Sequence, residues 1–248
     1  MSLLRTATDL ARRGARRVSD WLGPYTAMWI MLAVGAAVVA GLAAIAAEIY
    51  EGVAENDGAA AFDRPVLEAF KAMRTPFWDA AVTNFTNLGG VIGMPIIALL
   101  ALAFFSWKSR TWRATILIVG VAAGSLLITT VGKLAIGRAR PDQLDAVPPF
   151  ETSPSFPSGH TLNATAIITI LVYLAWLALD NRLIKIAVSI LGVLFVIAMG
   201  LSRVFLGHHW MTDVLAAFAI GLAWAAVVIL AHRTYWMVRD VREEASAA

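Results

Sequence analysis

Residues 114–141 read ATILIVGVAAGSLLITTVGKLAIGRARP, and this stretch determines the class of fold that the chain adopts. Its apolar part, residues 114–136, carries a single charge, at Lys133. An apolar run of roughly 18 residues or more indicates a membrane-spanning helix, because about 20 residues of helix cross the ~30 Å of bilayer hydrocarbon. The run is followed at once by Arg138, Arg140 and Pro141. We therefore expect a transmembrane helix that ends among cations.

Five more apolar blocks of similar length occur along the chain. Their approximate bounds are Tyr25–Ala47, Gly90–Trp107, Thr161–Leu179, Ile184–Leu201 and Met211–Ala231. Together with residues 114–136 they predict an all-α, polytopic membrane protein with six transmembrane helices.

The composition agrees with a single membrane domain and excludes several classes of site. Of the 248 residues, 59% are hydrophobic and 15% are charged, whereas soluble domains carry roughly 25% charged residues. The chain has no cysteine, which excludes disulfides, thiolate metal sites and a cysteine nucleophile. The net charge of +3 comes from short basic flanks between apolar blocks, a pattern that indicates topology signals and not a nucleic-acid-binding face.

We divide the chain into three parts. Residues 1–24 place arginines between apolar residues and are expected to form a cytoplasmic amphipathic segment; a cleavable signal peptide is the alternative. Residues 25–231 form the six-span domain. Within it, residues 48–89 are expected to be an extracytoplasmic loop with an interfacial helix, since apolar residues recur there at steps of three and four. Residues 232–248 are expected to be a cytoplasmic tail.

The distribution of basic residues predicts the orientation of the chain. If the N-terminus is cytoplasmic, thirteen of the twenty lysines and arginines fall on cytoplasmic segments. The positive-inside rule therefore places both termini in the cytoplasm. Of the seven basic residues on the other side, four are Lys133, Arg138, Arg140 and Arg203, which a topology signal does not explain.

Three segments carry these cations together with residues that can do chemistry. The first runs from Lys133 through six residues to Arg140-Pro141. The second is the tetrapeptide 157–160, Pro-Ser-Gly-His. The third begins at Ser202-Arg203 and continues through five residues to His209 and three more to Asp213.

The residue types in these segments suit a phosphate group. Arginine forks bind phosphate oxygens in pairs and lysine adds a point charge, so Lys133, Arg140 and Arg203 are candidate phosphate ligands. Ser158 and Gly159 at a helix start offer a hydroxyl and backbone N–H groups to an anion.

The remaining residues of the segments suit nucleophilic and acid catalysis. His209 and Asp213 are four residues apart, so on a helix they would share a face. The carboxylate could then hold one imidazole nitrogen and leave the other free to attack. His160 is left as a general acid.

The number of spans between the segments predicts one shared site. No span separates Arg140 from His160, and two spans separate His160 from Arg203. All three segments therefore meet at the extracytoplasmic face of the bundle. Each segment alone has a structural explanation: a span flank, a helix-initiating turn, or a structural His–Asp pair. Their order and common side favour a single catalytic site.

Together the three segments resemble the signature of the type 2 phosphatidic acid phosphatase and vanadium haloperoxidase superfamily. The resemblance implies a lipid phosphatase that acts through a phosphohistidine at His209, with Asp213 orienting it and His160 as the general acid. It implies that Lys133, Arg140, Ser158, Gly159 and Arg203 hold the phosphate, and that neither a metal nor another cofactor is needed. Undecaprenyl pyrophosphate, phosphatidylglycerol phosphate, phosphatidic acid and lipid A phosphates are all possible substrates.

Three other functions remain open at this point. A lipid phosphotransferase would use the same site and differ only in its acceptor. A vanadate-dependent haloperoxidase is disfavoured by the six spans, since that chemistry resembles soluble proteins. A non-catalytic lipid-binding or transport protein is disfavoured by the complete set of motifs. A short, compact chain of this kind is typical of a bacterial inner membrane, and its partners are expected to be membrane lipids and no nucleic acid. The oligomeric state is not predicted.

Overall fold

The computed structural model describes the backbone of residues 2–247 and the side chains of residues 26–108, 110–239 and 243. Throughout the described backbone the regular elements are helices, and no strand is found. The α-helices are α1 (Ser2–Glu55), α2 (Asp63–Ala72), α3 (Pro76–Thr86), α4 (Gly93–Ser109), α5 (Arg113–Ile136), α6 (Gly159–Ala178), α7 (Arg182–Phe205) and α8 (Met211–Ala247). Short 3₁₀ turns lie at η1 (Gly58–Phe62), η2 (Asn87–Gly89) and η3 (Gln143–Asp145).

The chain divides into two units, and every predicted site residue lies in the second. The first unit combines residues 1–38 with residues 230–248, and the second comprises residues 39–229. Within the first unit α1 and α8 approach closely, because a β-carbon on Gly35 would lie 2.8 Å from the side chain of Leu230. The expected amphipathic character of residues 1–24 falls outside the described side chains.

The helices confirm the prediction of an all-α, membrane-spanning protein. Among the residues whose side chains are described, five segments are long and apolar enough to cross a bilayer: Thr26–Glu55, Arg113–Ile136, Gly159–Ala178, Arg182–Phe205 and Met211–Arg239. A sixth span results if residues 76–89 and 93–108 act as one span that bends by 49°. The predicted span at residues 90–107 is thus part of a bent helix pair, because the chain turns at Gly90 before α4 begins.

The expected loop at residues 48–89 is more helical than its sequence indicated. The helix α1 continues to Glu55, past the predicted end at residue 47, because Glu48, Glu51 and Glu55 favour a helix as well as an aqueous boundary. The rest of the segment forms η1, α2 and α3.

Small residues allow the helices of the second unit to pack closely. A β-carbon on Gly124 of α5 would collide with Trp224 of α8, whose indole Nε1 donates a hydrogen bond to the Val121 carbonyl at 3.0 Å. Gly221 of α8 faces Thr165 of α6 in the same way, at 2.8 Å. Small residues at such contacts let backbones approach within a membrane. This packing fixes α5, α6 and α8 relative to one another.

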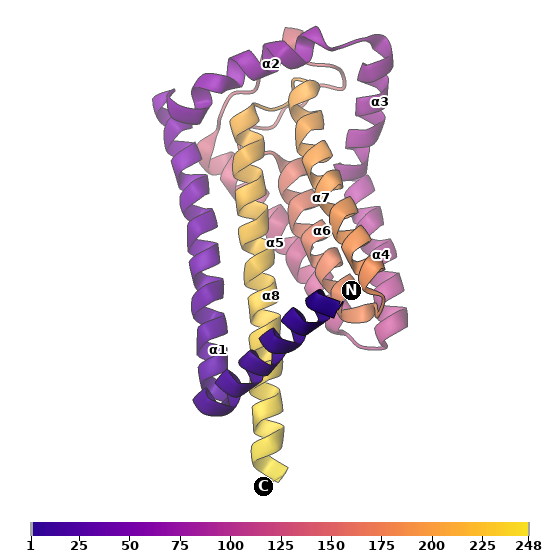
Figure 1. The fold of residues 1–248 in the computed structure, drawn as a ribbon. Coiled ribbons are helices and arrows are strands. Elements are labelled where there is room, and N and C mark those ends of the chain that lie inside the picture. Colours follow the sequence, from indigo (N-terminus) through magenta and orange to yellow (C-terminus); the bar gives the residue numbers. More distant parts are fainter. Residues whose placement is uncertain (1, 248) are drawn as a thin grey trace. The chain divides into compact units, whose positions relative to one another are not determined.

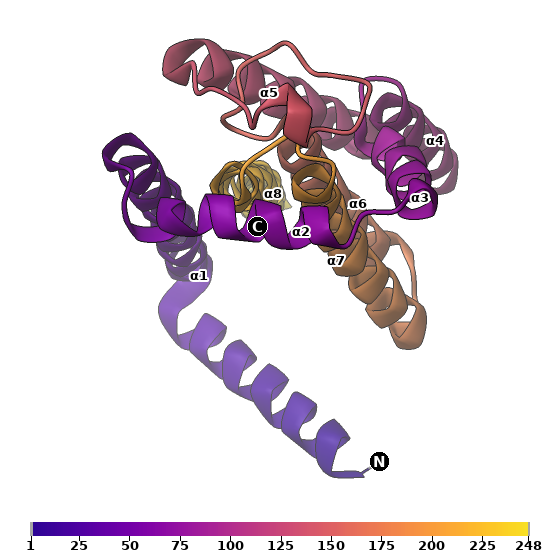
Figure 2. The same cartoon turned by 90° about the horizontal axis from the view of Figure 1, so that it is seen from above.

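Because successive long helices run in alternating directions, the ends that carry the three motifs meet. The C-terminal ends of α5 and α7 lie at the same end of the second unit as the N-terminal ends of α6 and α8 (Figure 1). The helix α2 and the loop 137–158 lie across this end, as the view from above shows (Figure 2). The helix is tied there by Arg74, whose guanidinium donates to the carbonyls of Phe205 and Asp145, each at 2.7 Å.

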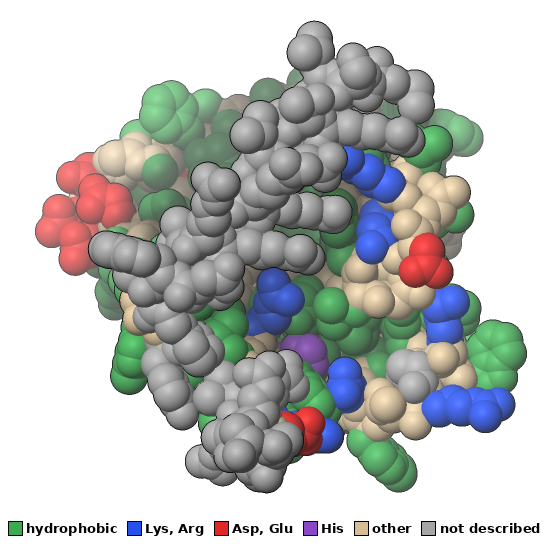
Figure 3. Space-filling view, turned by 60° about the horizontal axis from the view of Figure 1, so that its bottom comes forward, with side chains coloured by type: hydrophobic (Ala, Val, Ile, Leu, Met, Phe, Trp, Pro, Cys, Tyr) green, Lys and Arg blue, Asp and Glu red, His purple; other side chains and the backbone are tan. Residues whose placement is uncertain are grey.

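The opposite end of the second unit carries the turns between α4 and α5 and between α6 and α7. Lysine and arginine side chains are exposed in a view that brings this end forward (Figure 3). The exposed basic residues of these two turns are Lys108, Arg110, Arg113 and Arg182.

Candidate active site

His209 and Asp213 are paired at the start of α8. Asp213 lies in the first turn of the helix, and its Oδ2 atom accepts a hydrogen bond from the backbone N–H of Trp210 at 2.9 Å. The same oxygen lies 3.3 Å from Nδ1 of His209. The sequence prediction of a shared helix face was wrong in its geometry, because His209 precedes the helix, which begins at Met211. The carboxylate of Asp213, which reaches back from the first turn of α8 to the Trp210 N–H, holds the imidazole instead.

Because Nδ1 of His209 faces a carboxylate, Nε2 is the ring atom left for another partner. Nε2 lies 3.2 Å from Nη1 of Arg140. The imidazole is 1% exposed, and its burial, followed by the positive charges of Arg140 and Arg203, lowers the pKa of His209 well below its ordinary value. His209 is therefore neutral at neutral pH, with a lone pair on Nε2.

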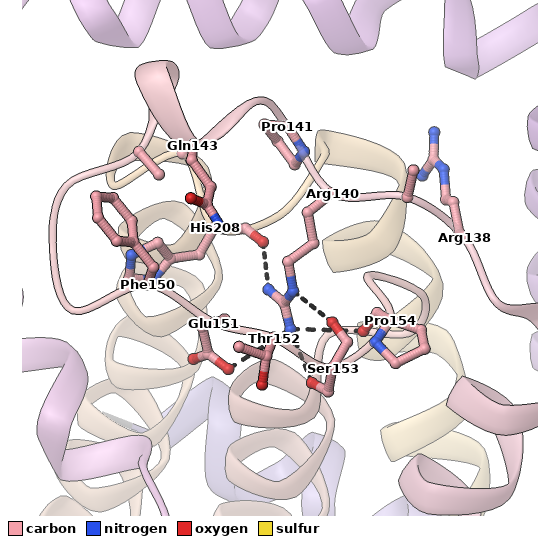
Figure 4. Close-up of a pocket in the computed structure, with 13 residues that line it drawn as sticks. Arg138, Arg140, Pro141, Gln143, Phe150, Glu151, Thr152, Ser153, Pro154 and His208 are labelled. Atoms are coloured by element: carbon pink, nitrogen blue, oxygen red, sulfur yellow. Dashed lines mark hydrogen bonds and ion pairs between the residues drawn. The ribbon is translucent and has the colours of Figure 1, made fainter.

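Lys133 and Arg140 reach the site from the end of α5. Gly137, at φ +63°, ends the helix in the left-handed region that glycine adopts freely, and the chain then runs extended through Arg140. The guanidinium of Arg140 donates to the Ser153 carbonyl at 2.6 Å and to the His208 carbonyl at 2.5 Å (Figure 4). Lys133 Nζ lies 3.2 Å from Ser153 Oγ and also donates to the carbonyl of Pro154. Both cations thus converge on the Ser153–Pro154 turn.

Arg203 brings a third cation from the last turn of α7. It is 1% exposed, and Nη1 donates to Thr86 Oγ1 at 3.0 Å. Nη2 is 2.6 Å from Oε1 of Glu151, whose other oxygen lies 3.5 Å from Nη2 of Arg140. Burial alone would raise the pKa of Glu151, but Arg203 and Arg140 outweigh it and lower the pKa to about 2. Glu151 is therefore an anion held between two of the predicted phosphate ligands.

The tetrapeptide of the second motif forms the N-terminal end of α6. Ser158 is the N-cap residue and is fully buried; its Oγ lies 2.9 Å from Thr161 Oγ1, and its backbone N–H faces the Asp213 carbonyl at 3.3 Å. A β-carbon on Gly159 would lie 3.0 Å from Thr129 of α5 and 3.9 Å from Cε of Lys133. Glycine thus lets the start of α6 lie directly against Thr129 of α5, next to Lys133.

His160 follows in the first turn of α6, on the side where the α3–α4 pair is broken. Its Nε2 atom lies 3.3 Å from the position that a β-carbon on Gly90 would occupy. It is close enough to Glu151 for its charge to affect the pKa of that carboxyl group. His160, in the first turn of α6, and His209, in the turn before α8, therefore border the same charged region.

A second layer of polar residues supports Asp213. Arg138 Nη1 donates to Asp213 Oδ1 at 2.5 Å, and Nη2 donates to Asp63 Oδ2 at 2.7 Å. Asp63 in turn accepts hydrogen bonds from the backbone N–H and the hydroxyl of Thr212, at 2.9 and 2.6 Å. Ser155 is fully buried and donates to Asp213 Oδ2.

Little in the sequence pattern indicates this second layer of polar residues. Arg138, one of the cations that a topology signal does not explain, lines the cavity, and its guanidinium bridges two carboxylates. Asp63 starts an amphipathic segment and Ser155 precedes a motif, and neither position carries a periodic or spacing signal. Glu151 likewise lies in a loop without a pattern.

A cavity of about 470 Å³ adjoins the site, and among the predicted site residues Arg140 is the one that lines it. The loops 138–154 and 207–208 line it, and Arg140 lies in its wall with Gln143 and Phe150 around it (Figure 4). Asp142 accepts a hydrogen bond from Leu144 N at 3.0 Å and caps η3. Among the described side chains, no group of three or more His, Asp or Glu residues is placed to hold a metal ion.

The structure thus brings the three motifs together, as their common side predicted. The imidazole of His209 contacts both Asp213 and Arg140. Arg140 and Lys133 are joined through the hydroxyl of Ser153. Arg203 joins them through Glu151.

The chain is similar in sequence and in fold to known proteins. Residues 113–237 match the family model described as the PAP2 superfamily. Phosphatidylglycerophosphatase B of Bacillus subtilis (strain 168) is 32% identical over 166 residues, which are 64% of this chain and 78% of the relative. A lipid A 1-phosphatase of Porphyromonas gingivalis is 29% identical over 62% of this chain, but the match spans only 31% of that protein. The crystal structure of the PAP2-type phosphatidylglycerolphosphate phosphatase from Bacillus subtilis superposes with a TM-score of 0.68 at 28% identity, over 78% of this chain and 93% of that one.

Proposed function

The chain belongs to the PAP2 superfamily, and on this premise we propose that it is a membrane phosphatase that hydrolyses a lipid phosphomonoester or pyrophosphate through a phosphohistidine at His209. One observation carries the proposal. A neutral, buried imidazole has its Nδ1 atom against a carboxylate and its Nε2 atom against the guanidinium of Arg140. A nucleophilic nitrogen next to phosphate-binding cations is what phosphoryl transfer requires.

In the first step, Nε2 of His209 forms a bond to phosphorus as the bond to the leaving oxygen breaks. Asp213 accepts the Nδ1–H bond and stabilises the positive charge that develops on the ring. Lys133, Arg140, Arg203, the Ser158 hydroxyl and the N–H groups around Gly159 hold the phosphate oxygens. Such fixed charges stabilise the transferring group without reorganising during the reaction.

His160 supplies the proton that the leaving oxygen takes up. The lipid then departs as an alcohol, or as a lipid phosphate when the substrate is a pyrophosphate. In the second step, water gives a proton to His160 and attacks the phosphohistidine, which releases inorganic phosphate and regenerates both histidines.

The names of the relatives support a lipid substrate with a terminal phosphate. One relative is a phosphatidylglycerophosphatase and another a lipid A 1-phosphatase. Phosphatidylglycerol phosphate, phosphatidic acid and undecaprenyl pyrophosphate all present such a group at the membrane surface. The cationic site also suits hydrolysis without a divalent metal ion.

We place the site on the extracytoplasmic side of a bacterial inner membrane, with both termini in the cytoplasm. The support for this orientation is the positive-inside rule together with the exposed basic turns at the end of the second unit opposite the site.

Phosphate release from the purified protein in detergent, across a panel of these lipids, tests the proposal. We expect release with at least one lipid in the presence of excess chelator, and inhibition by vanadate. Labelled phosphate should be trapped on the wild type under alkaline denaturing conditions, which preserve a phosphohistidine, and not on His209→Ala. Label trapped on His209→Ala, or activity that depends on an added divalent ion, would contradict the proposed chemistry. Label recovered in a second lipid instead of inorganic phosphate would identify a phosphotransferase.

A further inference from the structure

The carboxylate of Glu151 contacts two of the arginines that are proposed to bind the substrate phosphate. One oxygen is 2.6 Å from Arg203 Nη2 and the other 3.5 Å from Arg140 Nη2. Both arginines belong to the set proposed to bind phosphate. The carboxylate thus makes the same kind of charge-assisted contact that a phosphate oxygen would make.

We propose that Glu151 is a displaceable counter-ion: it occupies part of the phosphate subsite in the free enzyme, yields to the substrate phosphate, and returns as inorganic phosphate leaves. This inference rests on the proposed function, because it assumes that Arg140 and Arg203 bind the phosphate.

The burial of Arg203 explains why the free enzyme needs such an anion. A buried guanidinium without a counter-charge is strongly destabilising. Arg203 is 1% exposed; the hydrogen-bond partners of its guanidinium in the described structure are Thr86 and Glu151, and its Nε has none. The nearby Asp213 is engaged by Arg138, Ser155 and the Trp210 N–H, so Glu151 supplies the opposing charge.

The position of Glu151 also allows it to move. The residue lies in the loop between η3 and α6 and lines the cavity, and its side chain is 31% exposed. The low pKa of about 2 means that the group is an anion whenever a phosphate arrives. It therefore competes with phosphate at all pH values at which the enzyme would work.

The competition has a consequence for turnover. Three cations that bind a substrate phosphate also bind the product, and binding the two equally slows product release. An internal carboxylate lowers the affinity for both phosphates, which favours release.

If Glu151 competes with phosphate, its removal should strengthen phosphate binding, whereas two simpler roles for Glu151 predict no such gain. If Glu151 serves only to hold Arg203 in place, its removal should weaken phosphate binding. If it acts through His160, its removal should slow hydrolysis of poor leaving groups and leave the affinity for free phosphate unchanged.

The test measures binding of inorganic phosphate and of orthovanadate to the intact, purified protein. We expect Glu151→Gln to bind both about tenfold more tightly than the wild type, seen in calorimetry and in the inhibition constants for lipid hydrolysis. Its KM should fall and its product inhibition should increase. Glu151→Asp keeps the charge on a shorter side chain and should show a smaller increase in affinity. Glu68→Gln is the matched control, because Glu68 pairs with Arg64 and Lys71 on the exposed face of α2; it should bind as the wild type does.

The outcomes separate this inference from the proposed function. Unchanged or weaker binding of phosphate and vanadate by Glu151→Gln overturns the counter-ion role. If Glu151→Gln does not fold, unchanged or weaker binding by Glu151→Asp overturns it instead. Absence of phosphate and vanadate binding by the wild type and by both Glu151 variants overturns the phosphate subsite itself.

Discussion

At the scale of single residues, the site separates three histidines by their surroundings. His209 has a carboxylate on one ring nitrogen and a guanidinium near the other. His160 borders Gly90 at the break between η2 and α4. His208 donates from Nε2 to the Val147 carbonyl at 2.7 Å, and its Nδ1 has no hydrogen-bond partner in the described structure. Because their contacts differ, each of these histidines needs a different test.

His160 is tested by the quality of the leaving group. If it protonates the departing oxygen, His160→Ala should lose about 10²–10⁴-fold in kcat on a lipid monophosphate. The loss should be much smaller on an aryl phosphate such as nitrophenyl phosphate, because nitrophenolate leaves without a proton. Steady-state kinetics on the two substrates measures the difference. Equal losses on both would show that His160 is not the general acid.

His208 is tested by the pH dependence of stability. Burial, followed by the charge of Arg203, lowers its pKa to about 4, while the unfolded chain titrates near 6.5. Between these values the unfolded state takes up a proton that the folded state does not, so stability is present above pH 6.5 and is lost as the pH falls towards 4.

The variant His208→Gln can keep a donor for Val147 but does not titrate. Between pH 6.5 and 4.5 the unfolding temperature of the variant in detergent should fall less steeply than that of the wild type. The two slopes should differ by about 2–4 °C per pH unit, which corresponds to a difference of roughly 1 kcal/mol per pH unit in the free energy of unfolding. Identical slopes would mean that His208 titrates alike in the folded and unfolded states.

At the scale of elements, α2 is connected to the catalytic turn through Asp63 and Arg138. Asp63 is the first residue of α2 and is 5% exposed. It holds both the N-terminal turn of α8, through Thr212, and the guanidinium that contacts Asp213. The helix α2, which is not among the candidate spans, therefore takes part in placing the carboxylate that contacts His209.

Loss of this connection should reduce catalysis more than substrate binding. Asp63→Asn leaves Arg138 with one carboxylate, so Asp213 and His209 are held less firmly. We expect kcat to fall by roughly ten- to a hundredfold with little change in KM, measured below the unfolding temperature of the variant.

Arg64→Gln provides the control on the same helix. Arg64 is 64% exposed; it pairs with Glu68 at 3.2 Å and with Asp145 at 3.7 Å, and ion pairs of such an exposed side chain contribute little. Its kinetics should match those of the wild type. A rise in KM at constant kcat in Asp63→Asn would instead indicate a role of α2 in substrate binding.

At the scale of the whole molecule, the alternating helices place the site and the basic turns at opposite ends of the second unit. Leu144 lies near the site in η3 and is 93% exposed, whereas Asp180 lies exposed in the turn between α6 and α7. Because α6 runs between these two regions and is apolar enough to cross a bilayer, the two positions should lie on different sides of the membrane.

The absence of native cysteine makes this orientation directly measurable. An impermeant thiol reagent added to spheroplasts should label Leu144→Cys, and should label Asp180→Cys only after the membrane is permeabilised. The reverse pattern would place the site in the cytoplasm, and labelling of both in intact spheroplasts would contradict the assignment of α6 as a span.

The sequence by itself determined the all-helical membrane fold, the family and the common end of the three motifs. Apolar length predicts a span from local composition alone, and counting spans between residues 140, 160 and 203 assigns them to one side. The same local reasoning failed where the chain leaves the apolar blocks. It ended α1 at residue 47 instead of Glu55 and made residues 90–107 a simple span instead of part of a bent pair.

Only the tertiary structure decided the contacts within the site. The pairing of His209 with Asp213 arises from a helix cap and not from a shared helix face. Glu151, Ser155 and Asp63 come from loops and from a surface helix, and they reach the site because the packed helices bring distant segments together. A contact between residues that are far apart in the chain leaves no spacing or period in the sequence, since it depends on where the helices pack.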